Sequence, residues 1–222
     1  MTWLRRHPLY ASFLAFGLLF LLVPEIDLWA SGLFYRVGDG FFLAPPLNPI
    51  HKAVPLLSTA IVVTLCAAWL IASLVSAAQS LRKGLIYLLL VALLGPGLLV
   101  NTLFKDHWGR ARPAQVENFG GDKAFSPAWV PGAQCQRNCA FACGDASVGF
   151  FFLAPAFILA KRRRAWLAVG LAAGGLLGLM RLAQGGHFLS DVIFSFYIVY
   201  FSAWLLHRWC YADTATLTED SP

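Results

Sequence analysis

The sequence predicts an all-α, polytopic membrane protein in which six transmembrane helices form one bundle. Hydrophobic residues make up 59% of its 222 residues and charged residues only 13%, against about 45–50% and about 25% in soluble domains. Long apolar runs recur along the chain, and many of the basic residues cluster in short connections between them. A water-soluble globule and a disordered chain are both excluded by this composition.

Three apolar runs carry no charge and predict spanning helices. They cover residues 8–24, 53–81 and 84–104. About 20 apolar residues are needed to cross a hydrocarbon core of about 30 Å. The first run is also longer than the apolar part of a signal peptide, so we expect it to be retained as a helix.

Three further runs are shorter or interrupted. They cover residues 146–160, 165–180 and 188–206, and the last contains Asp191. At about 1.5 Å per residue, 15 or 16 residues reach only about 22–24 Å. We therefore expect their outer ends to draw polar residues toward the membrane, where ionisable groups mark functional sites.

The distribution of lysine and arginine orients the bundle. With the N-terminus inside, short inner segments hold 9 of the 17 basic residues: Arg5, Arg6, Arg82, Lys83, the run 161–164 and Arg208. Basic residues are retained on the cytoplasmic side. We therefore expect both termini in the cytoplasm and the candidate active site at the periplasmic face of a bacterial inner membrane. This topology assigns the whole net charge of +6 to the inside, so nucleic acid is not needed as a partner.

The chain is expected to be one domain over residues 1–222. Residues 28–35 form an amphipathic stretch that we expect to lie in the membrane interface. We expect residues 105–145 to form a long outer loop, and residues 212–222 to form a frayed, polar cytoplasmic tail. Gly170, Gly174 and Gly178 repeat at a spacing of four, which favours close helix packing within the bundle over a dimer contact.

Polar residues of three segments meet at the predicted outer face. Lys105, Arg112 and Arg181 supply three cations, and Cys143 and Gly144 precede the fourth apolar run. Arginine and lysine bind phosphate oxygens, while backbone amides at a helix N-terminus favour an anion. The segments therefore predict a phosphoryl site. Metal-ligand spacings are not evident, so we expect a reaction without metal or cofactor.

His187 and Asp191 lie four residues apart, on one face of a helix. We expect Asp191 to hold one imidazole nitrogen and to leave the other free as a nucleophile or base. His107 and Arg110 are secondary candidates within the first segment. Arg110 is expected either to be a solvated loop residue or to make a secondary contact with substrate.

Together the three segments resemble the signature of the membrane-bound phosphatidic acid phosphatase type 2 superfamily. The matching parts are Lys105-x6-Arg112-Pro113, then Gly144-Asp145 with its flanks, then Arg181-x5-His187-x3-Asp191, within a core of residues 84–207. The resemblance implies that the three cations grip the phosphate. It also implies that His187 attacks phosphorus to form a phosphohistidine.

The middle part departs from the family pattern. The family has a histidine that protonates the leaving group, whereas Asp145 occupies its place here. Three nearby cations favour the ionised carboxylate, which cannot donate a proton. Three alternatives stay open: Asp145 acts as an acid at lowered pH, His107 supplies the proton, or the leaving group needs little help.

The outer loop also carries three cysteines in a compartment that permits disulfides. A Cys135–Cys139 bridge is the preferred interpretation, with Cys143 a free thiol beside the site. The spacing of the three fits no metal site.

These observations predict hydrolysis of a phosphate monoester or pyrophosphate of a membrane lipid. Candidate substrates are lipid A, undecaprenyl pyrophosphate, phosphatidylglycerophosphate and phosphatidic acid. Two alternatives stay open, a lipid-to-lipid phosphotransferase and a non-catalytic phospholipid-binding protein with an altered middle motif. The oligomeric state is not predicted.

Overall fold

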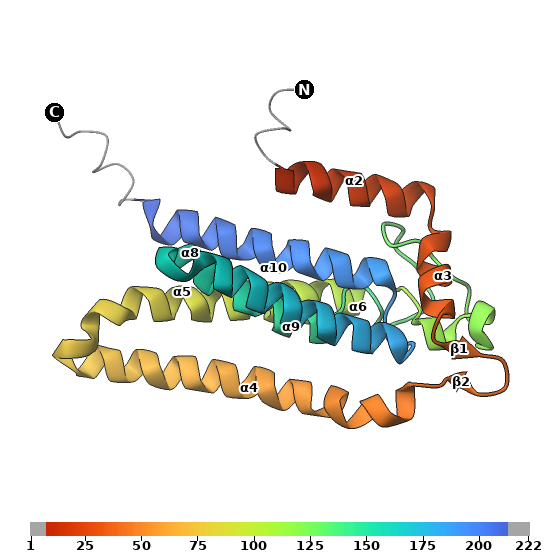
Figure 1. The fold of residues 1–222 in the computed structure, drawn as a ribbon, viewed down its shortest axis with the longest axis horizontal. Coiled ribbons are helices and arrows are strands. Elements are labelled where there is room, and N and C mark those ends of the chain that lie inside the picture. The colour runs from red at the N-terminus through yellow and green to blue at the C-terminus, as the bar shows by residue number, and fades with distance from the viewer. Residues whose placement is uncertain (1–7, 213–222) are drawn as a thin grey trace.

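A computed structural model describes residues 8–212 as a bundle of helices with a long loop at one end (Figure 1). Two expectations fall outside the described residues: the basic pair Arg5 and Arg6, and residues 213–222 of the polar tail. Within residues 8–212, four helices are long and apolar enough to cross a membrane, and a bent pair would make a fifth. The six predicted crossings are thus found only in part.

The bent pair forms the N-terminal part of the fold. Helix α2 (Pro8–Leu22) and helix α3 (Glu25–Gly32) meet at an angle of 86°. Pro24 lies at the bend. A short hairpin of β1 (Tyr35–Arg36) and β2 (Gly40–Phe41) follows, with Tyr35 opposite Phe41. The predicted interfacial stretch is therefore the end of α3 and the approach to β1.

Helix α4 (Ala44–Leu74) begins nine residues before the predicted run. Its start contains Pro45 and Pro46, and proline suits the first turn of a helix because the amide it lacks has no intrahelical partner there. The sequence interpretation began instead at residue 53, after the last charged side chain. The early start carries the polar residues Asn48 and His51 on the same helix as the apolar run.

A single long helical segment returns from η1 (Ser76–Leu81) through α5 (Arg82–Ala92) to η2 (Leu93–Phe104) and α6 (Lys105–His107). Element η2 is a stretch of π-helix that contains Pro96. Such wider turns often occur at functional sites. The loop that follows includes η3 (Pro113–Gln115) and η4 (Glu117–Phe119).

The fourth apolar run is broken rather than continuous. It consists of α7 (Gly144–Phe150), η5 (Phe151–Leu153) and α8 (Pro155–Ile158). Together these form a shorter apolar segment, below the length of the four long helices. Every residue of α7 is buried, so the segment is enclosed by protein.

Helix α9 follows η6 (Ala160–Arg162) and spans Arg163–Ala183. Its glycine stripe packs within the bundle, as expected. A Cβ at Gly170 would clash with Leu153, one at Gly174 with Phe150, and one at Gly178 with Val192. The stripe therefore lets α7, η5 and α10 lie directly against α9.

Helix α10 (Leu189–Cys210) runs through the middle of the bundle. Its aromatic residues pack against α2, where the Phe13 ring meets the rings of Phe194, Tyr197 and Phe201 edge-on. Burial of such large side chains is the main stabilising contribution that the sequence offers.

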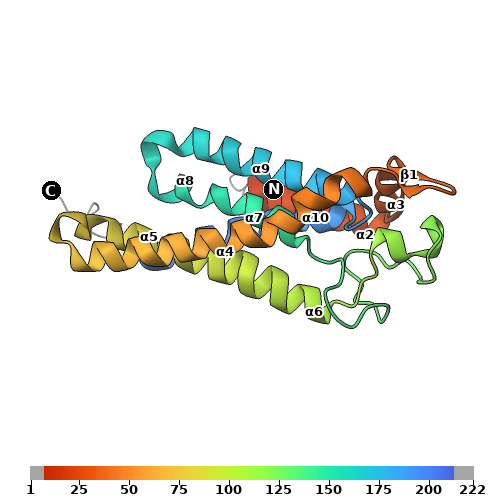
Figure 2. The ribbon, with the colours of Figure 1, turned by 90° about the horizontal axis from the view of Figure 1, so that it is seen from below.

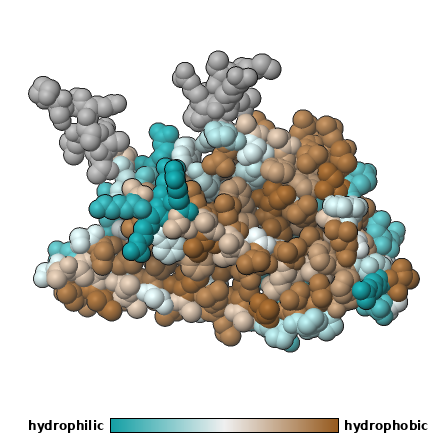
Figure 3. All heavy atoms as spheres, viewed as in Figure 1, coloured by the Kyte–Doolittle hydropathy of each residue, from teal (hydrophilic) through white to brown (hydrophobic). Residues whose placement is uncertain are grey.

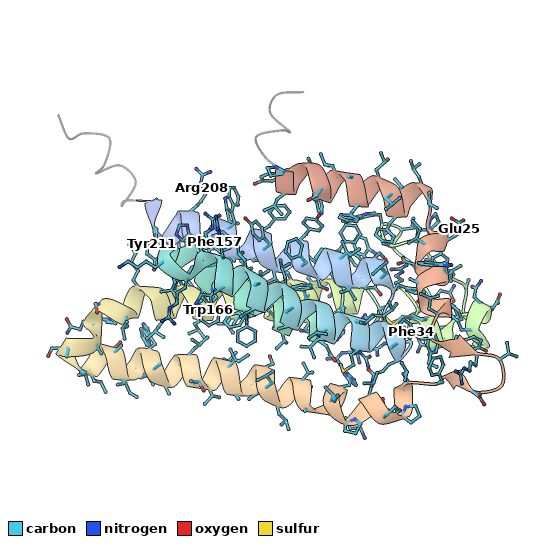
Figure 4. The ribbon with its side chains drawn as sticks, in the orientation of Figure 1. Glu25, Phe34, Phe157, Trp166, Arg208 and Tyr211 are labelled. Carbon is cyan, nitrogen blue, oxygen red and sulfur yellow. A yellow bond between two sulfur atoms is a disulfide. The ribbon has the colours of Figure 1, made fainter. Side chains whose placement is uncertain are left out.

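The two ends of the bundle differ in chemistry. Arg82, the run 161–164 and Arg208 lie at one end, whereas α3, the hairpin and the long loop lie at the other (Figures 1 and 2). Arg208 and Glu25 mark the two ends in Figure 4. Figure 3 shows apolar side chains across most of the face between them.

Candidate active site

A cavity of about 470 Å³ opens at the loop end of the bundle. Helices α4, α6, α7 and α9, element η2 and the long loop each contribute to its wall. Its polar lining residues are His51, Ser58, Thr59, Asn101, Lys105, Arg112, Asn138, Asp145, Arg181 and His187. The structure thus brings together the three predicted cations and His187. The first and last of these residues, Lys105 and His187, lie 82 positions apart in the sequence.

Lys105 is held in the cavity by the preceding helical turn. Its Nζ donates a hydrogen bond of 3.1 Å to Oδ1 of Asn101, whose Nδ2 donates to the carbonyl of Pro96. Gly144 faces this pair, and a Cβ there would lie 2.8 Å from Nζ of Lys105 and closer still to Asn101. Glycine at position 144 therefore leaves room for the lysine head group.

Arg112 is positioned by the far side of the long loop. Its Nη2 donates to the carbonyl of Asn138 at 2.9 Å and to the side chain of Asn138 at 3.0 Å. The disulfide between Cys135 and Cys139, with Cα atoms 5.6 Å apart, closes the segment that presents Asn138. This is the pairing that the sequence interpretation preferred.

Arg181 is fixed by hydrogen bonding at the end of α9. Its Nη1 donates to Oε1 of Gln184 at 2.7 Å, and Gln184 contacts Asn48 of α4. Its Nε is buried and has no hydrogen-bond partner among the described residues. A phosphate oxygen would satisfy this donor, since buried polar groups are normally paired.

The three cations face few negative charges. Burial and the neighbouring Arg181 guanidinium lower the pKa of Arg112. Such a shift is expected where like charges are gathered for an anion. Residues 8–212 contain no group of three or more His, Cys, Asp or Glu side chains that could hold a metal ion.

His187 lies between α9 and α10 and is almost fully buried. Its Nδ1 is 2.6 Å from the carbonyl oxygen of Ala140. A carbonyl can only accept, so Nδ1 carries the proton and Nε2 keeps its lone pair. Burial, together with Arg112, Arg181 and Lys105, lowers the pKa of His187 well below 6.5. The imidazole is therefore neutral near pH 7 and suited to nucleophilic attack.

Asp191 lies near His187 but forms its hydrogen bonds with other residues. Its Oδ2 is 3.7 Å from Nδ1 of His187, and the same oxygen accepts a 2.7 Å hydrogen bond from the backbone amide of Phe188. Its Oδ1 accepts a 2.6 Å hydrogen bond from Nη1 of Arg110. The expected hydrogen bond to the imidazole goes instead to Ala140, and Asp191 anchors the turn that carries His187.

Arg110 corrects the sequence interpretation. It is neither solvated nor placed to contact substrate, because its side chain is fully buried and outside the cavity lining. Its guanidinium pairs with Asp27 at 2.7 Å as well as with Asp191. A buried charge requires partners of opposite sign, and Asp27 of α3 was not identified from the sequence.

Two other predicted residues lie away from the cavity lining. His107 is exposed at the end of α6, and its Nδ1 contacts the carbonyl of Leu103 at 3.0 Å. Cys143 is buried at the start of α7 and does not line the cavity. Burial raises the pKa of Cys143 to about 12, so its thiol stays neutral and does not oppose a bound phosphate.

Asp145 lines the cavity with a partner that the sequence did not reveal. Its Oδ2 is 2.6 Å from Nδ1 of His51 on α4 and 3.7 Å from Nε of Arg181. The only local signal for His51 is the series Asn48, His51, Pro55 and Ser58. Its spacing of three and four residues indicates one face of a helix.

An apolar groove adjoins the cavity. Ser58 and Val148 line both the cavity and a small neighbouring pocket, which shares Ile61 and Phe151 with a larger hollow of about 400 Å³. The larger hollow is lined by residues of α4, α5, η5, α8 and α9 and includes Trp166, labelled in Figure 4. His51 lines the cavity and Leu65 lines the larger hollow. Between these two residues α4 rises about 21 Å, at about 1.5 Å per residue.

Three gathered cations and a neutral buried histidine, at one end of an apolar helical bundle, are the arrangement expected of a membrane phosphatase. The chain belongs to the PAP2 superfamily, whose model matches residues 83–215. The resemblance seen in the sequence is therefore confirmed, and the chain is a phosphatase.

Three similar proteins carry the name Lipid A 4'-phosphatase. One, from Francisella tularensis subsp. novicida (strain U112), is 41% identical over 207 residues, which cover 86% of this chain and 89% of the relative. One from Rhizobium leguminosarum is 39% identical over 128 residues, or 57% of this chain and 52% of that protein. One from Rhizobium etli is 38% identical over 143 residues, or 64% and 51%. No solved structure is significantly similar to the chain.

Proposed function

We propose that the protein hydrolyses a phosphate monoester of lipid A on the periplasmic side of a bacterial inner membrane. The reaction passes through a phosphohistidine at His187. The observation that carries this proposal is the cavity in which Lys105, Arg112 and Arg181 surround the neutral imidazole. The relative from Francisella tularensis subsp. novicida supports lipid A over the other candidate lipids, because it matches most of both chains.

The reaction proceeds in two steps at the phosphorus atom. Nε2 of His187 forms a bond to phosphorus as the bond to the leaving oxygen breaks, and that oxygen takes up a proton. Water then attacks the phosphohistidine, the bond from nitrogen to phosphorus breaks, and inorganic phosphate leaves. The three cations stabilise the charge on the phosphoryl oxygens in both steps.

The apolar groove supports a lipid substrate. It begins at the polar cavity and continues along α4, which carries apolar side chains there. An acyl chain in this groove would bury its surface while the phosphate stays among the cations. Entry of the lipid from the side of the bundle follows from this arrangement.

The test is a phosphate-release assay on purified protein with lipid A, undecaprenyl pyrophosphate, phosphatidylglycerophosphate and phosphatidic acid. We expect fastest release from lipid A and none with His187→Ala. Trapping phosphate on the wild-type chain, and its absence in His187→Ala, tests the intermediate. Faster release from any other lipid, or activity that survives His187→Ala, contradicts the proposal.

Phosphate transfer to a second lipid remains an alternative outcome of the same intermediate. Radiolabelled phosphate found on an added acceptor lipid, rather than in solution, would favour it. The family match and the named relatives make the chain an enzyme, which sets aside the non-catalytic alternative.

The orientation has its own test. Val37 is 93% exposed in the turn between β1 and β2, and Leu81 is 61% exposed at the basic end. In a chain without Cys66 and Cys210, we expect a membrane-impermeant maleimide to label Val37→Cys in intact cells. Leu81→Cys should be labelled only after lysis. The reverse pattern would place the cavity on the cytoplasmic side.

A further inference from the structure

We propose that His51 is the acid that protonates the leaving group, and that Asp145 orients it. The inference rests on the proposed function. It follows from the contact between Nδ1 of His51 and Oδ2 of Asp145 in the wall of the phosphate cavity.

The reaction needs a proton donor because the leaving group of an alkyl phosphate is a poorly stabilised alkoxide. Among the groups lining the cavity, His187 is the nucleophile and the three cations hold the phosphate. His107 lies outside the cavity lining. His51 is the remaining imidazole in this wall, and histidine is the side chain that most readily exchanges a proton near neutral pH.

The contact with Asp145 determines which ring nitrogen of His51 can donate a proton to the leaving oxygen. The aspartate side chain is only 9% exposed and its oxygen is 2.6 Å from Nδ1, so this nitrogen donates its hydrogen to the carboxylate. No described residue forms a hydrogen bond with Nε2. Nε2 is therefore the nitrogen available to the leaving oxygen, and the 35% exposure of the His51 side chain lets water restore its proton.

Charged residues on several neighbouring elements line the same cavity as the His51 imidazole. Asp145 on α7 contributes a negative charge to the cavity wall, whereas Lys105 on α6, Arg112 in the loop and Arg181 on α9 contribute positive charges. A bound phosphate dianion offsets the three cations. With substrate bound, the ring of His51 therefore lies beside the negative charges of the carboxylate and the phosphate.

The proton cycle balances over the two steps. In the first, the proton on Nε2 of His51 moves to the leaving oxygen as the phosphoryl group moves to His187. In the second, neutral His51 accepts a proton from the attacking water, whose oxygen bonds to phosphorus. The enzyme returns to its starting state with an alcohol and inorganic phosphate released.

The test compares two soluble amphiphiles that differ in leaving group. Dodecyl phosphate has a poor alkoxide leaving group, and a para-nitrophenyl phosphate bearing a dodecyl chain has a good one. For His51→Gln we expect kcat on dodecyl phosphate to fall about 10²–10⁴-fold and to fall far less on the aryl ester. KM should change little, and the decline of kcat at alkaline pH should disappear.

His107→Gln is the matched control, because this exposed histidine lies outside the cavity lining. We expect it to retain wild-type rates on both esters. Equal losses on both esters with His51→Gln, or no loss, would overturn the role of His51. The proposed function would still stand if His187→Ala is inactive. Activity that survives His187→Ala would instead overturn the proposed function itself.

A second variant keeps the inference testable if His51→Gln does not fold. Asp145→Asn preserves the shape of the carboxyl group but removes the negative charge that Nδ1 of His51 contacts. We expect a smaller loss with the same dependence on leaving group. Thermal unfolding of each variant shows whether the fold is intact. An Asp145→Asn chain with wild-type rates and pH profile on both esters would contradict the orienting role.

Discussion

Arg110 and Asp191 form a fully buried ion pair, with Nη1 of the arginine 2.6 Å from Oδ1 of the aspartate. Asp27 of α3 contacts the same guanidinium and also receives hydrogen bonds from Ser190. The arginine therefore joins the N-terminal bent pair to the start of α10. His187 lies four residues before Asp191, so the proposed nucleophile is positioned by a network that does not itself line the cavity.

Removing one partner of this network should destabilise the fold. With Asp191→Asn, we expect a loss of about 3–5 kcal/mol in the free energy of unfolding, because Arg110 is left buried with one carboxylate fewer. Asp27→Asn should cost a similar amount. Thermal unfolding in detergent measures both. A stability within error of wild type for both variants would contradict the role given to the ion pairs.

Gly144 should be required for substrate binding rather than for folding. In Gly144→Ala the new Cβ displaces Asn101 and the Lys105 head group, and we expect kcat/KM to fall about ten- to a hundredfold. Gly175→Ala is the control, because a Cβ at that position would meet no atom within 4 Å apart from the neighbouring backbone of α9. Unchanged activity for Gly144→Ala would show that the lysine can move without cost.

The pH dependence should reflect the buried His187, the proposed nucleophile. Since the pKa of His187 is lowered well below 6.5, the acid decline of kcat/KM assigned to it should begin well below that pH. The same shift has a consequence for stability. In the unfolded chain the histidine takes up a proton below about 6.5 and the folded chain does not, so stability falls as the pH drops through that range. His187→Ala should remove this part of the pH dependence of Tm, and an unchanged dependence would contradict it.

The Cys135–Cys139 disulfide should act on Arg112. Its loop is short, so in the chain-entropy account reduction costs about 2 kcal/mol or less. We expect a larger effect on KM, because the bridge closes the segment through which Asn138 holds Arg112. Activity assays of Cys135→Ser, with and without reductant, check this. A KM equal to that of the oxidised wild type would show that the loop keeps its shape without the bridge.

The sequence predicted the long helices and part of the site for different reasons. The uncharged runs indicate apolar helices through composition alone, and the motif segments identify Lys105, Arg112, Arg181 and His187 because each is a local pattern. The start of α4 was missed because the predicted run was begun after the last charged side chain, Lys52, whereas the helix already begins at Ala44. His51 lies 94 positions from Asp145, and such a contact has no local signal.

The sequence did not reveal the buried roles of Arg110 and Asp27, because both depend on contacts between distant segments. Arg110 lies within the first motif, where arginine commonly serves a solvated or phosphate-binding role, and only packing shows it to be enclosed. Asp27 follows the first apolar run and meets Arg110 because α3 bends back over the loop. Both depend on the angle between α2 and α3, which hydropathy does not encode.

The apolar groove should determine which lipids react. Ala60 of α4 lines its larger hollow, and in Ala60→Trp the indole would fill part of the space proposed for an acyl chain. We expect kcat/KM on lipid A to fall about tenfold or more, while a short-chain alkyl phosphate keeps its rate, because a bulky side chain excludes only ligands that need the space. Val63→Trp is the matched control, since Val63 is 61% exposed and does not line the groove. Equal losses on long and short substrates would mean that the chain lies elsewhere, and equal losses in both variants would trace the effect to α4 itself.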